Sequence, residues 1–569
     1  MLIGGLGLGL YAAMSLPALP GVSEHRAAAR AGVEAPSTVA VAPTATLPLD
    51  VPQTLALNAP HMADQVRPAT ALRVFLEPGL PASLLTAIDA LDAGSVAVSN
   101  HDTPDAVRLS WTADGGEPIY RQVFAAATRF DTVELTLRLL HVQRAWRGET
   151  RTFPTVIVYA DTLPALTRLL GEPGPHVQTV EGDDDLMAAV YAQRGVLALV
   201  PFERLTPRLA VYSVDGQSPV ENALKFHAAA YPLVATVYAH AGMDAPSDAV
   251  SRVDTLLPRS NRDPSRLTVV AMTGVTAMVR LTADQMDRLG YDWPARVIGR
   301  ELASADITVI SNEVPFVEGC ETNTSADNLV FCSKPEYMET LVRSGVDLIG
   351  LTGNHQNDYG LKNALASLEF YAEAGLPVYG GGVDKTAAFA PAILEHNGNR
   401  LAFLGANSYG PPSAWATDFS PGSAPFDLAI MSATIRNLKA KELADVVFAE
   451  LQYQESYGVE PLFEQRRDFG ALARAGADVV TGVQSHVPQA VEFVDGRLVL
   501  HGLGNLYFDQ MWREDTREGM IAKHTIYAGR HISTQLLPTL LYEYGQPRWP
   551  DADRRAAILG KVFAAGRWE

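Results

Sequence analysis

Seven short apolar runs, rich in β-branched residues, recur between Leu267 and Pro547, and this rhythm constrains the fold more than any other feature of the sequence. Stretches with apolar residues at helical spacing lie between them, for example over 335–345 and 461–476. Such alternation predicts an α/β layer. Each run ends where Gly, Asn, His or Gln appears, which is where open α/β sheets place ligand sites, so we expect the functional site here. The runs are LTVVAM (267–272), ITVISN (307–312), DLIGLTGN (347–354), LAFLGAN (401–407), DVVFAEL (445–451), DVVTGV (478–483) and LVLHGLGN (498–505).

Composition divides the 569 residues into two globular parts with connecting segments. Residues 71–244 also alternate strand-like and helix-like runs, which predicts a smaller α/β domain. A polar linker over 245–266 precedes the domain over 267–548, and residues 549–569 are expected to form a tail. Residues 23–70, rich in Ala, Pro and Thr, are typical of an extended linker.

The first 22 residues contain no charged side chain and are just long enough to cross a bilayer as a helix. They lack the basic residues with which a secretory signal begins, and they contain five Gly and two Pro. The alternatives are an anchor, a signal remnant and an apolar tail. We expect an extracytoplasmic protein, membrane-anchored through this segment or secreted.

The charge balance limits the partners of the protein. Lys and Arg number 45 against 64 Asp and Glu, which gives a formal net charge of −19. A phosphate backbone is bound mainly by clustered cations, so nucleic-acid binding is not expected. The same charge would repel an anionic polymer unless a metal or a local basic patch intervened.

The two cysteines, Cys320 and Cys332, flank one polar loop. So few cysteines rule out a Cys-rich zinc module and a disulfide scaffold. In an oxidising compartment this pair predicts a disulfide, the alternative being two unpaired small core residues.

The densest chemical signal is the segment LTGNHQNDYG over 351–360. A buried strand is predicted to end at Gly353, and Asn354, His355 and Asp358 then share one turn ahead of a helix. An Asn amide oxygen can bind a hard cation, and a His in this place can act as a general acid. The alternative is a helix start that Asn and Asp cap.

The order of motifs resembles the CapA family of capsule and poly-γ-glutamate synthesis proteins, which belongs to the calcineurin-like metallophosphoesterase superfamily. The resemblance implies a metallophosphoesterase-like four-layered α/β sandwich over 267–548. Its clearest match is the Asn-His-x-x-Asp-Tyr-Gly turn. The matching segments are ADITVISNEVPF (305–316), GVDLIGLTGNHQNDYG (345–360), YGVEPLFEQ (457–465), GADVVTGVQSHVPQAVEF (476–493) and LGNLYFDQ (503–510).

The chain departs from the family pattern at positions that would carry metal ligands. Val275 stands where the family has the Asp of Gly-Asp, and Gln452 stands where it has the His of His-Trp-Gly. Gln484 replaces the first His of Gly-His-His-Pro-His, of which His486 survives, and Ser311 replaces the Asn of Asn-x-Glu. A two-metal site needs a bridging anionic oxygen and several imidazoles, which these replacements do not supply.

The resemblance leaves Glu313, Asn354 and His486 as residual metal ligands, with His355 and Asp358 as the catalytic pair. This set could hold one divalent cation (Mn, Zn or Fe) weakly, and we do not expect it to hold two.

A second interpretation keeps the site as a cleft with altered chemistry. Gln452, Gln484, Gln489 and Asn505 would line it and bind a carboxylate or a sugar hydroxyl. The alternative is that these amides only satisfy polar groups of buried loops.

The segment over 196–222, followed by Tyr231-Pro232-Leu233, weakly resembles the second half of phosphate-type periplasmic solute-binding proteins. Residues 129–149 are similar to the segment near their hinge. No loop rich in Ser, Thr and Gly stands near 72–84 to bind an anion, so the resemblance implies the fold and leaves ligand binding open.

Together these features predict a part in extracellular polymer (capsule or poly-γ-glutamate) biosynthesis or export. The alternatives are a non-catalytic pseudoenzyme that binds polymer or a partner, and an active metal-dependent hydrolase. Whether the chain is an enzyme stays open at this point. The partners expected are an anionic polymer or the cell-envelope synthesis machinery.

Overall fold

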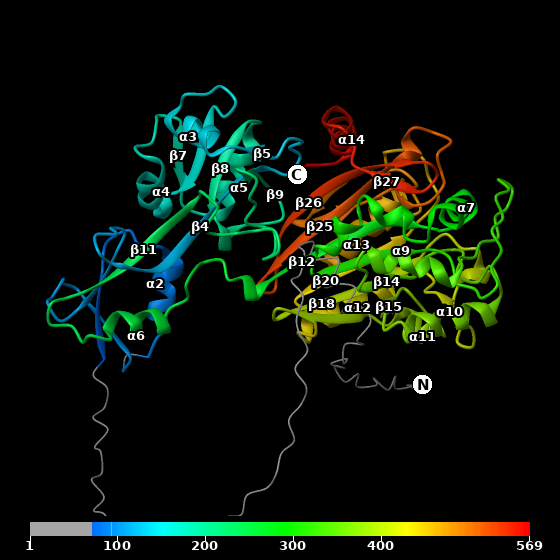
Figure 1. Cartoon of the computed structure of the whole chain (residues 1–569), viewed down its shortest axis with the longest axis horizontal. Helices are drawn as coiled ribbons and strands as arrows, with labels where there is room; N and C mark the ends of the chain where they lie inside the picture. The colour runs from blue at the N-terminus through cyan, green and yellow to red at the C-terminus, as the bar shows by residue number, and fades with distance from the viewer. Residues whose placement is uncertain (1–70, 93, 569) are drawn as a thin grey trace, which may run out of the picture.

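The structure is a computed structural model, and it describes residues 71–92 and 94–568 (Figure 1). Two α/β domains follow one another along the chain, so the α/β class expected for both parts is confirmed. The expected anchor over 1–22 and linker over 23–70 lie outside the described residues. Among the residues that are described, no helix combines the length and apolar character that crossing a bilayer requires.

The C-terminal domain is built on two sheets. The first has the strand order β15-β14-β13-β12-β25-β26-β27, with β24 paired to β12. Its strands are β12 (Leu267–Thr276), β13 (Ile307–Asn312), β14 (Leu348–Gly350), β15 (Val378–Tyr379), β24 (Asn505–Tyr507), β25 (Glu518–Tyr527), β26 (Arg530–Tyr542) and β27 (Gln546–Arg548). The second has the order β17-β18-β20-β21-β23-β22. Its strands are β17 (Ala392–His396), β18 (Asn399–Asn407), β20 (Val446–Gln452), β21 (Val479–Val483), β22 (Val491–Val494) and β23 (Arg497–Leu500).

The strands that carry the sequence motifs are parallel within each sheet. In the first sheet β12 pairs with β13, β13 with β14, and β14 with β15, all in parallel. In the second sheet β18, β20, β21 and β23 are parallel in the same way. Parallel strands end at the same edge of their sheet, so the polar turns after these strands gather there.

An apolar layer holds the two sheets face to face. Successive side chains of a strand point to opposite faces, so each strand contributes alternate residues. Phe403 and Phe448 stack with their ring centroids 4.8 Å apart, and Tyr379 packs against Phe403. The layer contains Val270, Met272, Ile307, Val309, Leu348, Tyr379 and Ile526 of the first sheet and Leu401, Phe403, Val446, Phe448 and Val479 of the second.

Helices cover both outer faces. Residues such as Ile435 and Phe469 of α12 and α13 pack on the second sheet, and residues such as Leu341 and Tyr371 of α9 and α10 share a core with the first. The resulting order of helix, sheet, sheet and helix is the four-layered α/β sandwich that the resemblance implied. The helices of this domain are α7 (Arg280–Leu289), α8 (Gly299–Ala303), α9 (Met338–Arg343), α10 (Leu361–Glu373), α11 (Lys385–Phe389), α12 (Leu428–Ala440), α13 (Phe463–Ala475) and α14 (Ala552–Ala565). A small sheet pairs β16 (Gly381–Gly382) with β19 (Gly422–Ser423).

The N-terminal domain has one mixed sheet with the order β2-β1-β3-β11-β4-β8-β6-β7, and β9 pairs with β4. Strand β4 pairs with β11 near its start and with β8 and β9 near its end, so it belongs to both halves of the domain (Figure 1). The strands are β1 (Leu72–Leu76), β2 (Val96–Ser99), β3 (Val107–Ser110), β4 (Glu117–Arg129), β6 (Thr155–Tyr159), β7 (Val177–Val180), β8 (Val196–Pro201), β9 (Leu209–Val211) and β11 (Val234–Ala241), with a separate pair of β5 (Thr136–Leu137) and β10 (Ser213–Val214). The helices are α2 (Ala82–Asp89), α3 (Leu139–Arg147), α4 (Leu163–Leu170) and α5 (Asp183–Ala192).

The two segments expected as a linker and a tail each contain a helix and contact neighbouring elements. Residues 245–266 contain α6 (Ala249–Leu256), and the buried Asn261 pairs with β4 as a strand would. Its side chain accepts the N–H of Val123 (2.7 Å) and donates to the carbonyl of Val123 (2.9 Å). The tail forms α14, which buries Leu559 and Val562 in a core shared with the second sheet.

A cluster of four charges joins the two domains. Lys523 of β25, only 3% exposed, donates to both carboxylate oxygens of Glu221 (2.8 and 2.9 Å) and to Glu301 of α8 (2.9 Å). Lys225 donates to the other oxygen of Glu301 (2.5 Å). Each carboxylate therefore has an ammonium partner where little water reaches it.

Replacing Lys523 with Met should lower the free energy of unfolding by about 3 kcal/mol, because Glu221 and Glu301 would lose the cation that they share. Urea unfolding followed by circular dichroism measures this loss. Arg288→Met is the control: it removes an exposed ion pair with Asp284 and should change the same quantity by less than about 0.5 kcal/mol. Equal, small effects of both substitutions would contradict the importance given to this cluster.

Candidate functional site

The polar side chains singled out in the sequence meet at the carboxyl ends of strands from both sheets. Glu313 follows β13, and Asn354 and His355 follow β14. From the other sheet, Gln452 ends β20 and His486 lies in the turn after β21. Gln452 donates to the amide oxygen of Asn354 (2.8 Å), which connects the ends of the two sheets directly.

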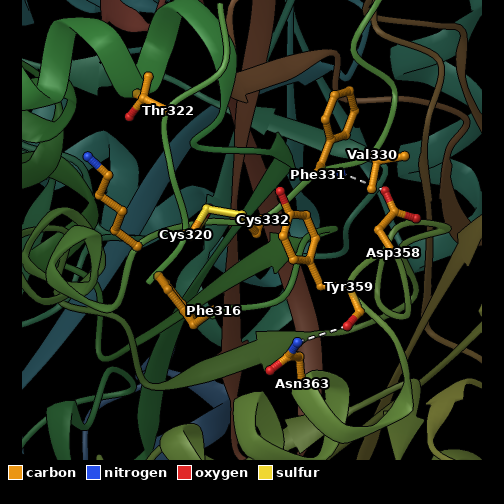
Figure 2. The surroundings of a disulfide bond; sticks show 12 residues. Phe316, Cys320, Thr322, Val330, Phe331, Cys332, Asp358, Tyr359 and Asn363 are labelled. Atoms are coloured by element: carbon orange, nitrogen blue, oxygen red, sulfur yellow. Dashed lines mark hydrogen bonds between the residues drawn. A yellow bond between two sulfur atoms is a disulfide. The ribbon is translucent and has the colours of Figure 1, made fainter. Parts of the chain in front are cut away.

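His355 and Asp358 form a partly buried pair just ahead of α10. The Nδ1 atom of His355 lies 2.6 Å from an oxygen of Asp358, and the backbone N–H of Phe331 donates to that same oxygen (2.8 Å; Figure 2). Burial favours the neutral imidazole, but the hydrogen bond to Asp358 and the charges of Glu313 and Asp358 outweigh it and raise the pKa of His355. The pair can therefore present a proton, as the sequence predicts for a general acid.

Glu313 is an almost fully buried carboxyl group, 4% exposed. Burial raises its pKa to about 7, and the nearby positive charge of His355 limits the rise. At neutral pH the group is therefore close to half protonated, so its negative charge is weaker than that of a typical metal-ligating carboxylate.

Gln452 belongs to a chain of amides whose members satisfy one another. Besides bonding to Asn354, it accepts a hydrogen bond from Asn407 Nδ2 (2.7 Å). Asn407 also donates to the carbonyl of Thr352 and accepts from the indole of Trp415 (3.0 Å). The sequence interpretation identified Gln452 but missed Asn407, which ends its own strand, β18, beside it.

His486 and Gln484 lie in the turn after β21, where their backbone φ angles are positive, 50° for His486 and 80° for Gln484. His486 Nδ1 lies 2.8 Å from the amide oxygen of Asn505, and burial lowers the pKa of this His. Asn505 is held in turn by the carbonyl of Thr516 (3.0 Å). The side-chain oxygen of Gln484 is buried and has no hydrogen-bond partner among the residues that the structure describes.

Gln489, the fourth amide predicted to line the cleft, serves its own loop. It donates to Ser456 and to the carbonyl of Gly458 (both 2.9 Å) and accepts from Gln465 (3.1 Å). For this residue the simpler alternative, an amide that satisfies a buried loop, describes the observed contacts.

Cys320 and Cys332 form the predicted disulfide (Figure 2). It closes the loop that carries Phe331, whose backbone N–H reaches Asp358 and whose ring lies 4.4 Å from the ring of His355. The loop therefore forms one wall of the site.

The donors present do not fit the two-metal centre that the fold family implies. Val275, at the position of the missing carboxylate, belongs to an apolar cluster with Val279, Val314, Phe331, Val483 and Phe508. The guanidinium of Arg280 lies about 5 Å from the rings of Phe331 and Phe508 and is near enough to influence the pKa values of Glu313, His355 and His486. In the described part of the chain, no group of three or more His, Cys, Asp or Glu side chains is arranged to hold a metal ion.

The sequence interpretation missed several residues of the site. Arg280 forms a two-point ion pair with Asp509, and Tyr457 stacks on His486. Glu455 accepts a hydrogen bond from the hydroxyl of Tyr457. Tyr457 and Asp509 lie inside segments that the resemblance had already marked, so that resemblance was the signal that could have located them.

The two stacked sheets and the polar site at their shared edge define a four-layered α/β domain. Residues 269–510 match the sequence model of the bacterial capsule synthesis protein family PGA_cap. This match confirms the resemblance that the motifs carry over that part of the chain.

Known relatives share the same part of the chain. The capsule biosynthesis protein CapA of Bacillus anthracis is 27% identical over 279 residues, which are 48% of this chain and 68% of that protein. The PGA biosynthesis protein CapA of Bacillus subtilis is 27% identical over 33% of this chain and 50% of its own length. A probable polyglutamine synthesis accessory protein of Mycobacterium tuberculosis is 25% identical over 50% of this chain and 80% of its own length.

Two solved structures are similar at a more remote level. A 5′-nucleotidase precursor of Thermus thermophilus is 15% identical, with a TM-score of 0.31, over 52% of this chain and 58% of its own. An ABC-type phosphate transport receptor of Vibrio cholerae is 10% identical, with a TM-score of 0.27, over 32% of this chain and 93% of its own. The description of the fold rests on the sheets, helices and core given above.

Glu313 should give the protein a pH-dependent stability. Its folded pKa of about 7 exceeds the usual 4.5, so the folded state binds the proton more tightly and stability falls as the pH rises between these values. In Glu313→Gln, the loss of unfolding free energy between pH 5 and pH 8 should be smaller by about 2 kcal/mol.

Denaturant unfolding at both pH values measures this difference. His355, whose raised pKa acts in the same direction, is present in both proteins. Glu318→Gln, which changes an exposed carboxyl, is the control and should follow the wild-type curve. If Glu313→Gln loses as much unfolding free energy between pH 5 and pH 8 as the wild type does, the pKa of Glu313 is not raised in the folded protein.

Proposed function

We propose that this protein takes part in the synthesis or export of an extracellular polymer of the bacterial cell envelope, and that its cleft binds the polymer instead of hydrolysing it. The match to the capsule synthesis family and the names of the CapA relatives support the first part. The second part rests on the composition of the cleft.

The observation that carries the binding role is the apolar cluster around Val275. A two-metal hydrolase needs an anionic oxygen there to bridge its cations. Here valine packs against apolar side chains, and the cation of Arg280 lies within electrostatic reach of the remaining donors. A dication entering this site would therefore meet the positive charge of a guanidinium and no bridging carboxylate at position 275.

The retained amides and imidazoles suit a binding role. They are organised by hydrogen bonds before any ligand arrives, so little conformational entropy is lost on binding. Amides donate and accept hydrogen bonds without requiring a counter-charge. An envelope polymer can therefore be recognised without a metal.

A hydrolase is the second candidate, and the His355–Asp358 pair favours it. The raised pKa of His355 gives the site a proton that could pass to a leaving-group oxygen. Metal ions, where a relative of this fold binds them, would activate the attacking water. In this chain, the ligands of one such ion would be Glu313, Asn354 and His486.

We place the protein outside the cytoplasm, as the sequence predicts. The disulfide between Cys320 and Cys332 supports this placement, because such bonds persist mainly in oxidising compartments. An attachment to the membrane through residues 1–22 is part of the same proposal.

The binding role predicts a metal-poor protein. Chains purified without chelator, dialysed against manganese and zinc and then desalted should hold well below one ion per chain by mass spectrometry. They should also leave bis-p-nitrophenyl phosphate uncleaved with either metal. Two firmly held ions, or metal-dependent cleavage, would establish the hydrolase instead.

The cleft should retain envelope polymer. In affinity electrophoresis through gels that contain either poly-γ-glutamate or extracted envelope polysaccharide, the wild-type chain should be slowed by at least one of them. His486→Ala should weaken the interaction about fivefold or more, since it removes one polar group of the cleft. Asn354→Ala, at a half-buried position, is a second variant with a smaller effect on folding.

The control for this experiment is His227→Ala, which removes an exposed imidazole from the N-terminal domain. It should migrate as the wild type does. Unretarded migration of the wild type in both gels would refute polymer binding.

A further inference from the structure

Three aromatic rings lead from the buried part of the cleft to its mouth. The ring of His486 stacks on Tyr457, with centroids 5.9 Å apart and planes at 21°. The ring of Tyr457 meets the indole of Trp512 edge to face at 5.0 Å. Trp512 is 61% exposed, so a large apolar face is open to solvent directly beside a polar cleft.

The cations around this path are already paired with carboxylates. Arg280 is held by Asp509, and Arg513, which lies over the indole of Trp512, is held by Asp515 (2.9 Å). His355 is likewise held by Asp358. Each pair lowers the positive charge that its cation presents to an anion.

Two further carboxyls lie along this path: Glu313 is buried in the site, and Glu455 is exposed beside Tyr457. Both appear among the charges that act on neighbouring groups of the site, and Glu455 lies at the exposed mouth beside Tyr457. An anionic polymer would be repelled here, which agrees with the net charge of −19.

The buried oxygen of Gln484 needs a hydrogen-bond donor. The side chain is 3% exposed, and its Oε1 atom has no partner in the described part of the chain, although buried polar atoms of folded proteins are nearly always paired. Gln484 lies in the same turn as His486, where the aromatic path begins. A hydroxyl group of a bound molecule would supply the missing donor.

We propose that the cleft binds an uncharged saccharide, with one sugar ring stacked on the indole of Trp512 and a hydroxyl of the chain donating to Gln484. A sugar ring presents an apolar face of C–H groups to an aromatic ring and hydroxyls around its edge, which matches this combination of groups. This inference rests on the polymer-binding role proposed above and specifies the chemical class of the polymer.

The test is titration calorimetry of the whole chain with uncharged hexasaccharides: α-1,4-glucan, β-1,4-glucan, β-1,3-glucan and α-1,6-mannan. At least one hexasaccharide should bind to the wild type. Trp512→Ala should lower the affinity for that hexasaccharide about tenfold, and Trp512→Phe should keep most of the affinity. Trp549→Ala, which removes a tryptophan that is 42% exposed beyond edge strand β27, is the matched control and should bind as the wild type does.

A second variant tests the hydrogen bond. Gln484→Leu keeps the approximate volume of the side chain and removes the acceptor, so it should weaken the same saccharide several-fold while the folded protein keeps its unfolding midpoint or gains stability.

Other outcomes would overturn the inference. Equal affinity of the wild type and Trp512→Ala, or binding of none of the hexasaccharides, refutes ring stacking. If the protein is slowed in the gel that contains poly-γ-glutamate but binds none of the hexasaccharides, the polymer-binding role stands and the saccharide assignment fails. Binding of choline through Trp512 with no saccharide bound would show that the aromatic path and Glu455 recognise a cation instead.

Discussion

The apolar layer between the two sheets is the constraint on which the rest of this domain depends. It holds the sheets in one relative orientation through rings such as Phe403 and Phe448, which stack in parallel planes. Because the motif-bearing strands of each sheet are parallel, that orientation also fixes where their carboxyl ends meet. The contact between Gln452 and Asn354 at the site is a consequence of packing deep in the core.

The proposed binding role would leave the fold intact while the chemistry of the family's metal site changes. Valine at position 275 extends the apolar packing of strand β12 into the place where the family has an acid. Glutamines at positions 452 and 484 keep polar groups where imidazoles stood, and the first of them is fully integrated into an amide chain. The electrostatics of the site also disfavour a metal ion, because burial weakens the negative charge of Glu313 and the guanidinium of Arg280 supplies positive charge nearby.

The two domains are coupled more tightly than the polar composition between them suggests. Asn261 imitates a strand by pairing with Val123, and Tyr527 of the C-terminal domain donates to the carbonyl of Asn261 (3.0 Å). Strand β4, on which Val123 lies, is common to both halves of the N-terminal domain. A movement between those halves would therefore act on the connection to the C-terminal domain.

The sequence by itself determined the α/β class, the edge of the sheets at which the site lies, the family, the disulfide and the His355–Asp358 pair. These follow from local periodicity and from motifs within a few residues of one another. The tertiary structure alone decided that Gln489 serves its own loop, that residues 552–565 form a packed helix, and that Arg280 and Asn407 lie at the site. The physical reason is that these roles arise from contacts between segments far apart in the chain, and one sequence carries no signal of which distant side chains a packed core brings together.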